Sequence, residues 1–248
     1  MPDILSITVL TCVGVVAGFI NVNAGGGSTL TLPVLIFLGL DTSAANGTNR
    51  IAILLQNVAA VQSFKQESFF DLKTSLKLSL FTLPGSVAGA LLAVRLEDEL
   101  FKIILGIIMI GIIISMILPK KKSINKDEPN KPNTGIYLSM IGIGFYGGFI
   151  QVGVGFLLMA SLQFLMKLDL VRVNMYKVFI VLIYTIPALL IFALTDNVYW
   201  LLGIFLAIGN VLGGWWGAKK QIKKGEGFIK YVLVIAVFIM ALKLLAVI

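Results

Sequence analysis

The sequence predicts an all-α polytopic membrane protein made of two homologous inverted repeats, each a re-entrant broken-helix hairpin followed by three transmembrane helices. Composition is the first indication, because 58% of the 248 residues are hydrophobic, 13% are charged and the mean hydropathy is +0.99. A soluble domain has about 45–50% apolar and about 25% charged residues. The second indication is a series of apolar segments with short polar connections, and the third is the recurrence of first-half motifs in the second half.

The apolar segments follow one another along the whole chain, and a helical span needs roughly 20 such residues. The second and seventh segments are too short for a full span, and each follows a glycine-containing break. They predict either one broken crossing with the preceding segment or a hairpin that enters and returns on one side. The first segment has no basic region before it, so we expect a membrane helix and not a signal peptide. The segments cover residues 4–22, 28–40, 44–64, 72–94, 100–118, 135–152, 156–166, 173–194, 198–218 and 228–248.

Short motifs occur in the same order in both halves, which indicates an internal duplication. We therefore expect a first membrane repeat at 1–118, a cytoplasmic linker at 119–133 and a second membrane repeat at 134–248. The matched motifs are Gly18-Phe19-Ile20 with Gly148-Phe149-Ile150, Leu40-Asp41 and Asn46 with Leu168-Asp169 and Asn174, and Gly85–Gly89 with Gly209–Gly213.

The distribution of basic residues selects between parallel and inverted repeats. If each short segment forms a hairpin, an odd number of spans remains in each repeat, and the two repeats have opposite orientations. With the linker in the cytoplasm, this arrangement puts 15 of the 20 Lys and Arg residues in cytoplasmic loops and two outside. Parallel repeats would divide them eight against nine. The positive-inside rule therefore favours inversion, with both termini outside.

The strongest local motif is a glycine break with polar residues on both sides. Consecutive glycines disfavour a helix by about 1 kcal/mol each relative to alanine, and in a membrane the freed backbone groups need a protein or water-lined environment. The short helix that follows would point its N–H groups and the positive end of its dipole at an anion. We expect a substrate-binding role here and at the second break; close helix packing by small residues is the alternative. The residues are Asn21, Asn23, Gly25, Gly26, Gly27 and Ser28, and at the second break Gln151 and Gly153.

Two cations, Arg50 and Lys177, lie inside apolar segments at similar places in the two halves. A charge at such depth costs roughly 2.5–3.5 kcal/mol on insertion scales, so it normally faces a polar interior. Neither cation has an acidic neighbour in its segment. We expect the two to hold an anion between the halves, Arg50 through two N–H donors and Lys177 as a point charge. Snorkelling to the nearer interface is the alternative.

Neutral polar side chains accompany the two cations. Residues four apart share one face of a helix, as Asn46 and Arg50 do. Gln56 and Asn57 are predicted to form interhelical hydrogen bonds, and a role in the site is the alternative. The side chains expected to complete the substrate site are Asn46, Thr48, Asn49 and Asn174.

Other polar and aromatic residues are assigned structural roles. Asp41 and Asp169 are predicted to cap the N-termini of helices. The pairs Tyr199-Trp200 and Trp215-Trp216 fit the aromatic belts found where membrane meets water.

The residue types that are missing exclude several classes of protein. The chain has no histidine, its one cysteine is Cys12, and its 12 Asp and Glu residues fall in or beside loops. A metal centre, a bound cofactor and a nucleophile–base pair therefore have no candidate residues, and we expect a protein that is not an enzyme. The net charge of +8 lies in short loops, so nucleic-acid binding is not expected either. Cys12 is predicted to be a small buried hydrophobe.

At these motifs the chain resembles the TauE/SafE family of sulfite and organosulfonate exporters, which is also grouped as toluene-sulfonate uptake permeases. The resemblance rests on Gly25–Pro33, Leu40–Thr48 and Gly147–Asn174, and it extends over nearly the whole chain. One departure is Gly153-Val-Gly155-Phe156, where a fuller glycine run and a proline are expected. The resemblance implies seven or eight helices from an internal duplication, and transport of small sulfur-containing anions across a bacterial inner membrane.

Residues and resemblance together predict a multi-pass secondary transporter that moves a small sulfur-containing anion by alternating access. An anion channel and a membrane-embedded assembly factor are the alternatives. The expected partners are sulfite, a sulfonate or a related oxyanion, the lipid bilayer of a bacterial inner membrane, and a coupling ion that is either a proton or sodium. A homodimer is a further open alternative, and no cofactor is expected.

Overall fold

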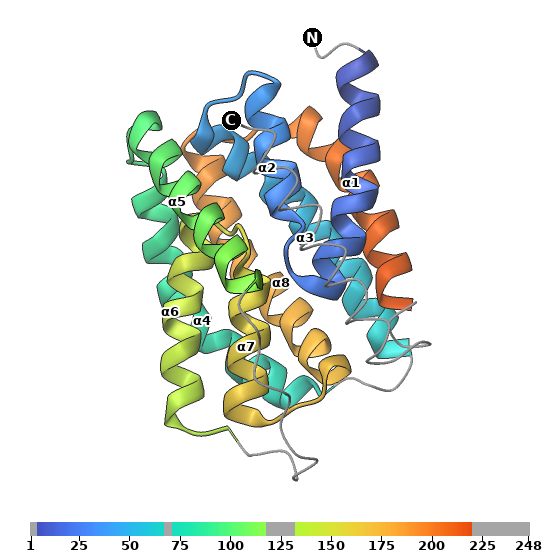
Figure 1. The fold of residues 1–248 in the computed structure, drawn as a ribbon, viewed down its shortest axis with the longest axis vertical. Helices are drawn as coiled ribbons and strands as arrows, with labels where there is room; N and C mark the ends of the chain where they lie inside the picture. Colours follow the sequence, from blue (N-terminus) through green and yellow to red (C-terminus); the bar gives the residue numbers. More distant parts are fainter. Residues whose placement is uncertain (1–3, 67–70, 118–131, 220–248) are drawn as a thin grey trace.

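The computed structural model describes residues 4–66, 71–117 and 132–219, and the regular structure in these ranges is entirely helical (Figure 1). The predicted segment at 228–248 and nearly all of the predicted linker lie outside the described residues. The helices are α1 (Ile4–Ala24), α2 (Ser28–Phe37), α3 (Thr42–Gln66), α4 (Leu72–Ala93), α5 (Asp98–Ile117), α6 (Thr134–Phe149), α7 (Val154–Met166), α8 (Leu170–Leu194) and a last helix, Trp200–Lys219.

Helix lengths agree with the predicted apolar segments. Four of the described helices are long and apolar enough to cross a membrane, whereas α2 has 10 residues and α7 has 13. A full span takes roughly 20 residues, so neither short helix crosses a bilayer alone. The four candidate spans are Ile4–Asn23, Leu72–Ala93, Leu170–Leu194 and Trp200–Lys219.

Each short helix follows a chain break at a glycine. Gly25 has a φ of +82° at the end of α1, and Gly153 has a φ of +72° at the start of α7, values that suit glycine because it lacks a Cβ. Gly27 lies against the backbone of Ala17, so α2 folds back along α1. In Figure 1 the α1–α2 pair begins and ends toward the upper end of the molecule, and the α6–α7 pair toward the lower end.

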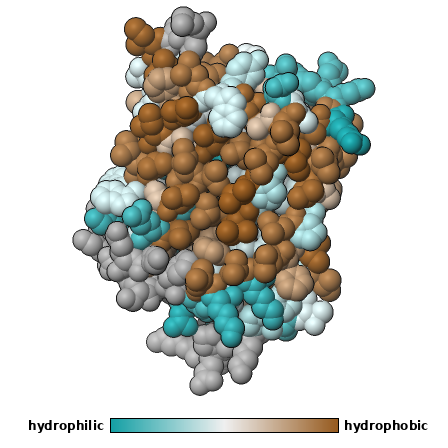
Figure 2. All heavy atoms as spheres, turned by 180° about the vertical axis from the view of Figure 1, so that it is seen from behind, coloured by the Kyte–Doolittle hydropathy of each residue, from teal (hydrophilic) through white to brown (hydrophobic). Residues whose placement is uncertain are grey.

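The outer surface of the molecule is apolar, and its interior combines an apolar core with buried polar residues. Leu190 and Leu212 are 57% and 56% exposed, whereas polar residues such as Asn46 and Arg50 are fully buried. Figure 2 shows the apolar surface across the middle of the molecule, with hydrophilic residues mainly toward its two ends. This distribution is that of a protein whose outer surface contacts lipid. The aromatic residues predicted for interfacial belts, Tyr199, Trp200, Trp215 and Trp216, all lie on the surface.

The prediction that Cys12 is buried is wrong. Its side chain is exposed on the outer face of α1. A thiol behaves as a small hydrophobe, and a lipid-facing surface accepts such a group as readily as a core does.

Two helix pairs hold the halves of the chain together through glycines. In the pair α4 and α6, a Cβ on Gly148 would overlap the backbone of Ser86. In the pair formed by α1 and Trp200–Lys219, a Cβ on Gly18 would overlap the backbone of Asn210. The sequence motifs predict Gly18 and Gly148 to be equivalent residues of a repeat, and both make the same kind of close contact. Each pair joins a helix of the first half to a helix of the second half, at the close approach that small residues allow in membranes.

The helices that carry Arg50 and Lys177 both begin with a carboxylate cap, although from different sources. Asp169 accepts a hydrogen bond from the backbone N–H of Arg172 at 2.9 Å, which confirms the predicted cap of α8. For α3 the sequence points to Asp41, but the structure gives the role to Asp98 of α5. Its Oδ1 accepts from the N–H and the Oγ1 of Thr42, at 2.7 and 2.6 Å.

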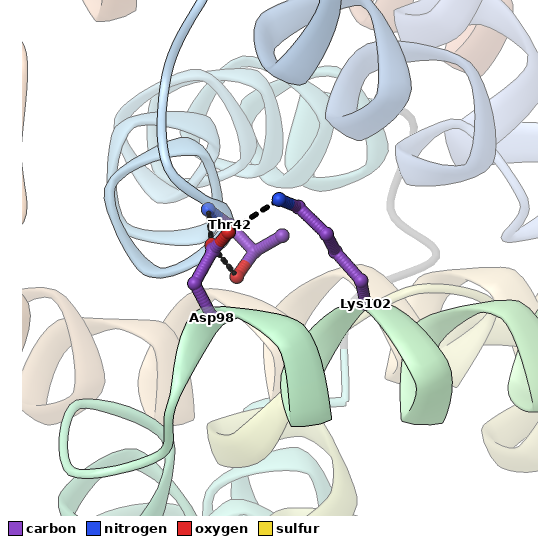
Figure 3. A network of polar contacts seen from close by, with 3 residues as sticks. All are labelled: Thr42, Asp98 and Lys102. Atoms are coloured by element: carbon purple, nitrogen blue, oxygen red, sulfur yellow. Dashed lines mark hydrogen bonds and ion pairs between the residues drawn. The ribbon is translucent and has the colours of Figure 1, made fainter.

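An ion pair completes the contact between α5 and the start of α3 (Figure 3). Lys102 Nζ lies 2.5 Å from Asp98 Oδ2, one helical turn away along α5. The hydrogen bonds from Lys102 and Thr42 lower the pKa of Asp98 from its ordinary 3.8 to about 2. Asp98 therefore stays ionised over the physiological pH range and fixes the start of α3.

Candidate functional site

A small cavity lies where the two chain breaks meet. Gly25, at the end of α1, contacts the backbone of Gly155, near the start of α7. The water-accessible volume of the cavity is about 10 Å³, which is room for roughly one water molecule. Its walls come from α1, α2, α3, α7 and α8, and from the break before α7. The lining residues are Asn21, Ser28, Ile53, Asn57, Gln151, Val154, Gly155, Lys177 and Val181.

Both short helices start at this cavity. Ser28 is the first residue of α2 and Val154 the first of α7, and both line the cavity. Neither helix has a side-chain cap at its N-terminus. Some of the first N–H groups bond to carbonyls of the preceding residues, as Thr29 does to Gly26 and Phe156 to Gly153, and the dipole of each helix favours negative charge at this end. Two such ends around one cavity make a positive environment without any charged side chain.

Lys177 of α8 reaches the end of α1. Its Nζ is within hydrogen-bond distance of three oxygens: the carbonyls of Asn21 at 3.1 Å and Val22 at 2.6 Å, and Asn174 Oδ1 at 2.5 Å. The Nδ2 of Asn174 donates in turn to the carbonyl of Asn23 at 3.3 Å. The last carbonyls of a helix lack intrahelical donors and attract cations. We call this arrangement, Lys177 and Asn174 on the end of α1, the Lys177 clamp.

Arg50 of α3 holds the end of α6 in the same manner. Its two terminal nitrogens donate to the carbonyls of Gly147 at 3.1 Å and Gly148 at 2.5 Å. Asn46, one turn earlier, donates to the carbonyl of Phe149 at 2.7 Å, and its Oδ1 lies 3.4 Å from Arg50. We call Arg50 and Asn46 on the end of α6 the Arg50 clamp. The guanidinium also lies 4.6 Å from the centre of the Phe192 ring, at cation–π distance.

Each clamp joins one half of the chain to the other. Arg50 belongs to the first half and binds a helix of the second, whereas Lys177 belongs to the second half and binds α1. Both cations are buried, with exposures of 0% and 2%, and the described part of the chain contains no buried Asp or Glu. The two positive charges therefore meet carbonyl dipoles and neutral amides instead of carboxylates.

Amide and hydroxyl groups of α2 and α3 form a network beside the cavity. Asn49 accepts from Thr31 at 2.7 Å and donates to Ser28 at 3.3 Å, which holds the start of α2 against α3. Asn21 donates to Gln56 at 3.1 Å, an interhelical bond of the kind predicted for Gln56. Gln151 donates to Thr185 at 3.2 Å, and its Oε1 is buried without a hydrogen-bond partner.

The structure brings some of the predicted site residues to the cavity and places others away from it. Asn21, Ser28, Gln151 and Lys177 line it, and Gly25 meets its wall at Gly155. Four more of them belong to the clamps: Asn23, Asn46, Arg50 and Asn174.

The remaining predicted residues have local structural contacts. The hydroxyl of Thr48 accepts from the backbone N–H of Tyr199 at 2.9 Å, at the start of the last helix. The Gly26 carbonyl accepts from Thr29, and Gly27 packs on Ala17. Gly153 provides the left-handed turn before α7.

The interhelical hydrogen bond predicted for Asn57 is wrong, because its amide bonds within α3, and the predicted site set did not include Asn57 or Gly155, which both line the cavity. Asn57 donates to the Ile53 carbonyl of its own helix and lines the cavity. Its separation from Asn49 and Arg50 is eight and seven residues, which puts all three on one side of α3, so helical periodicity would have pointed to it. Among the described residues, no three His, Cys, Asp or Glu side chains gather as metal ligands would.

Broken helices around a buried cavity that Lys177 and neutral polar side chains help to line, inside a lipid-facing helical shell, are typical of a multi-pass membrane transporter. The sulfite exporter TauE/SafE family model matches residues 10–244, and the chain belongs to this family, as its motifs predict. The chain is 28% identical to the probable membrane transporter YfcA of Escherichia coli K12 (99% of this chain, 91% of the relative). It is 28% identical to the probable membrane transporter ORF9 of a Sinorhizobium species (93% and 89%) and 26% identical to YunE of Bacillus subtilis (93% and 96%). No solved structure matches the chain.

Proposed function

We propose that this membrane transporter is a secondary transporter that carries a small sulfur-containing anion, such as sulfite or a sulfonate, across the bacterial inner membrane by alternating access. The observation that carries the proposal is the pair of buried cations, Arg50 and Lys177, without a buried carboxylate among the described residues. Buried charges are normally paired, and a permeating anion would supply the missing negative charge.

The cavity adds to this argument for an anion. Lys177 and the N-termini of α2 and α7 all face it, and the neutral donors and acceptors around it suit the oxygens of a small oxyanion. The proposed mechanism uses no proton relay of intramembrane carboxylates and histidines, which is the usual relay in pumps. The proposed substrate site consists of residues that line the cavity and residues that position them, with Arg50 among the latter: Asn21, Asn23, Gly25, Gly26, Gly27, Ser28, Asn46, Thr48, Asn49, Arg50, Gln151, Gly153, Asn174 and Lys177.

Membership in the TauE/SafE family supports sulfur chemistry in particular. The family model carries the name sulfite exporter, and sulfite and alkyl sulfonates share the trigonal set of anionic oxygens that the cavity donors would bind. A proton or sodium ion is the proposed coupling ion.

The small size of the cavity supports a carrier over a channel. A volume of about 10 Å³ is too small for a sulfur oxyanion, so binding would require the two breaks to separate. The opposite entry of the two hairpins in Figure 1 supports inverted repeats, the architecture that produces alternating access in many transporters. A channel would instead keep a continuous conducting pathway.

Flux measurements in proteoliposomes test the proposal. The purified protein should take up labelled sulfite or methanesulfonate with saturation and with counterflow. Lys177→Ala should abolish this flux and Arg50→Ala should lower it mainly by reducing the amount of folded protein, whereas Lys73→Ala, which removes an exposed cation at the start of α4, should leave it unchanged. Large unitary currents would identify a channel, and full flux in a folded Lys177→Ala protein would disprove the site.

A further inference from the structure

The donors of Lys177 are fully used in the closed cavity. An ammonium group has three N–H donors, and the Nζ of Lys177 already faces three oxygens at 3.1 Å or less. An anion that enters the cavity therefore binds Lys177 only by displacing one of them. Two of the three are backbone carbonyls of α1, those of Asn21 and Val22.

These carbonyls belong to the part of α1 that adjoins the break. The carbonyl of Asn21 also accepts the N–H of Gly25 at 2.9 Å, so the bond to Lys177 bears directly on the last turn of α1. Gly25 in turn contacts Gly155 across the cavity. When Lys177 releases α1, the end of α1 that contacts α7 loses its hydrogen bonds to the Lys177 ammonium group.

The Arg50 clamp lacks this connection to the cavity. Arg50 does not line it. Its terminal nitrogens donate to Gly147 and Gly148, and the ring of Phe192 lies against the guanidinium. An anion in the cavity can therefore compete for the Lys177 clamp and leave the Arg50 clamp intact.

We propose that Lys177 both binds the substrate and holds the cavity closed. The substrate anion competes with the α1 carbonyls for the Nζ of Lys177, and binding of the anion frees the end of α1. Arg50 is a positioning residue that keeps the end of α6 fixed in both states. This inference rests on the proposed function, because it requires an anion in the cavity. It follows that a substrate shifts the population toward states in which the two breaks have separated.

Hydrogen–deuterium exchange on the full-length protein in nanodiscs tests the proposal, because the proposal predicts that sulfite makes exchange faster and not slower at its own site. Ligands usually slow exchange at their site, but here saturating sodium sulfite should speed exchange in peptides that span residues 20–27. The increase should be on the order of tenfold, as expected for the loss of a hydrogen bond to a charged group. Peptides that span residues 143–149, the end of α6 that Arg50 holds, should not change.

Variants separate the two clamps. Lys177→Met should show fast exchange at residues 20–27 before sulfite is added, and no further response to it. Arg50→Met should show fast exchange at 143–149 and retain the sulfite response at 20–27. Lys177→Arg, which keeps the charge and the donors, should restore slow exchange at 20–27. Lys73→Ala is the control, and unchanged exchange in α4 identifies variants that are folded.

Two results would overturn the proposal. One is slower or unchanged exchange at 20–27 in the wild-type protein under conditions in which sulfite raises its melting temperature. The other is equal exchange at 20–27 in the wild-type protein and in folded Lys177→Met. If sulfite and methanesulfonate are neither bound nor transported, the proposed function fails, and the comparison of sulfite-free Lys177→Met with wild type then decides whether the clamp exists.

Discussion

The two clamps use one structural principle with different side chains. In each, a cation and an asparagine about one turn away on a helix of one half bind the last carbonyls of a broken helix in the other half. Arg50 uses its planar fork to bind two successive carbonyls and is stacked on a ring. Lys177 uses a compact point charge at the edge of a cavity.

This difference teaches why a buried cation is not automatically a ligand site. A free carbonyl in a membrane needs a donor as much as a buried cation needs an acceptor. Each clamp meets both needs, and in this respect Arg50 and Lys177 stabilise the fold. Only the position of Lys177 on the cavity wall gives it a second function, so the two cations should respond differently to mutation.

The largest effect is expected from replacing the two cations, because Lys177 should affect substrate affinity and Arg50 should affect the stability of the protein. Lys177→Gln should raise the KM for sulfite at least about 30-fold, because removing one partner of a buried charged interaction costs about 2–5 kcal/mol. Arg50→Gln should lower the melting temperature and the yield of folded protein, with a much smaller change in KM. Transport kinetics and thermal unfolding of the same preparations provide the measurement. Equal KM changes in the two variants would remove the distinction between the clamps.

A second experiment asks whether the fork of Arg50 matters. Arg50→Lys keeps the charge but cannot donate to Gly147 and Gly148 with the same geometry, so one carbonyl loses its partner. The free energy of unfolding, measured by SDS titration in mixed micelles, should fall by about 1–3 kcal/mol. A variant as stable as the wild type would show that any cation at this position suffices.

A third experiment concerns the helices that the clamps hold, α6 and α1. Gly148→Ala and Gly18→Ala should each destabilise the protein by about 1–3 kcal/mol, because the new Cβ overlaps the backbone of the neighbouring helix. Gly142→Ala is the matched control, since a Cβ on this α6 glycine would have no neighbouring atom within 4 Å. It should be neutral or slightly stabilising. Equal effects at Gly148 and Gly142 would argue against the close α4–α6 contact.

The smallest effect concerns how the clamp-bearing helices begin. Asp98→Asn weakens a cap that α5 supplies to α3, whereas Asp169→Asn weakens a cap within α8, and such caps contribute typically about 1 kcal/mol. Because the pKa of Asp98 is lowered in the folded protein, ionised Asp98 contributes to the free energy of unfolding above about pH 4. This contribution is lost as the pH falls toward 2. Wild-type melting temperature should therefore fall more between pH 5 and pH 3 than that of Asp98→Asn. Parallel pH profiles would contradict this assignment.

Much of the fold could be predicted because the signals are local. The limits of α4, the break at Gly25 and the cap at Asp169 each follow from residues within one or two helical turns. The same local basis predicts a cap at Asp41, and here the prediction is wrong, since the accepting carboxylate comes from Asp98, 56 residues from Thr42. The prediction for Cys12 is wrong for a related reason, because sequence does not show which face of an apolar helix turns outward.

The sequence by itself determined that this chain belongs in a membrane, that two helices break at glycines, that two cations are buried and that the family is TauE/SafE. These properties depend on composition, spacing and motifs. Only the tertiary structure decided what the cations bind. Arg50 and Gly147 are 97 residues apart, and Lys177 and Asn21 are 156 apart. The partner of a buried charge depends on which chain segments pack together, and packing brings carbonyls of the opposite half, not a carboxylate, to each cation.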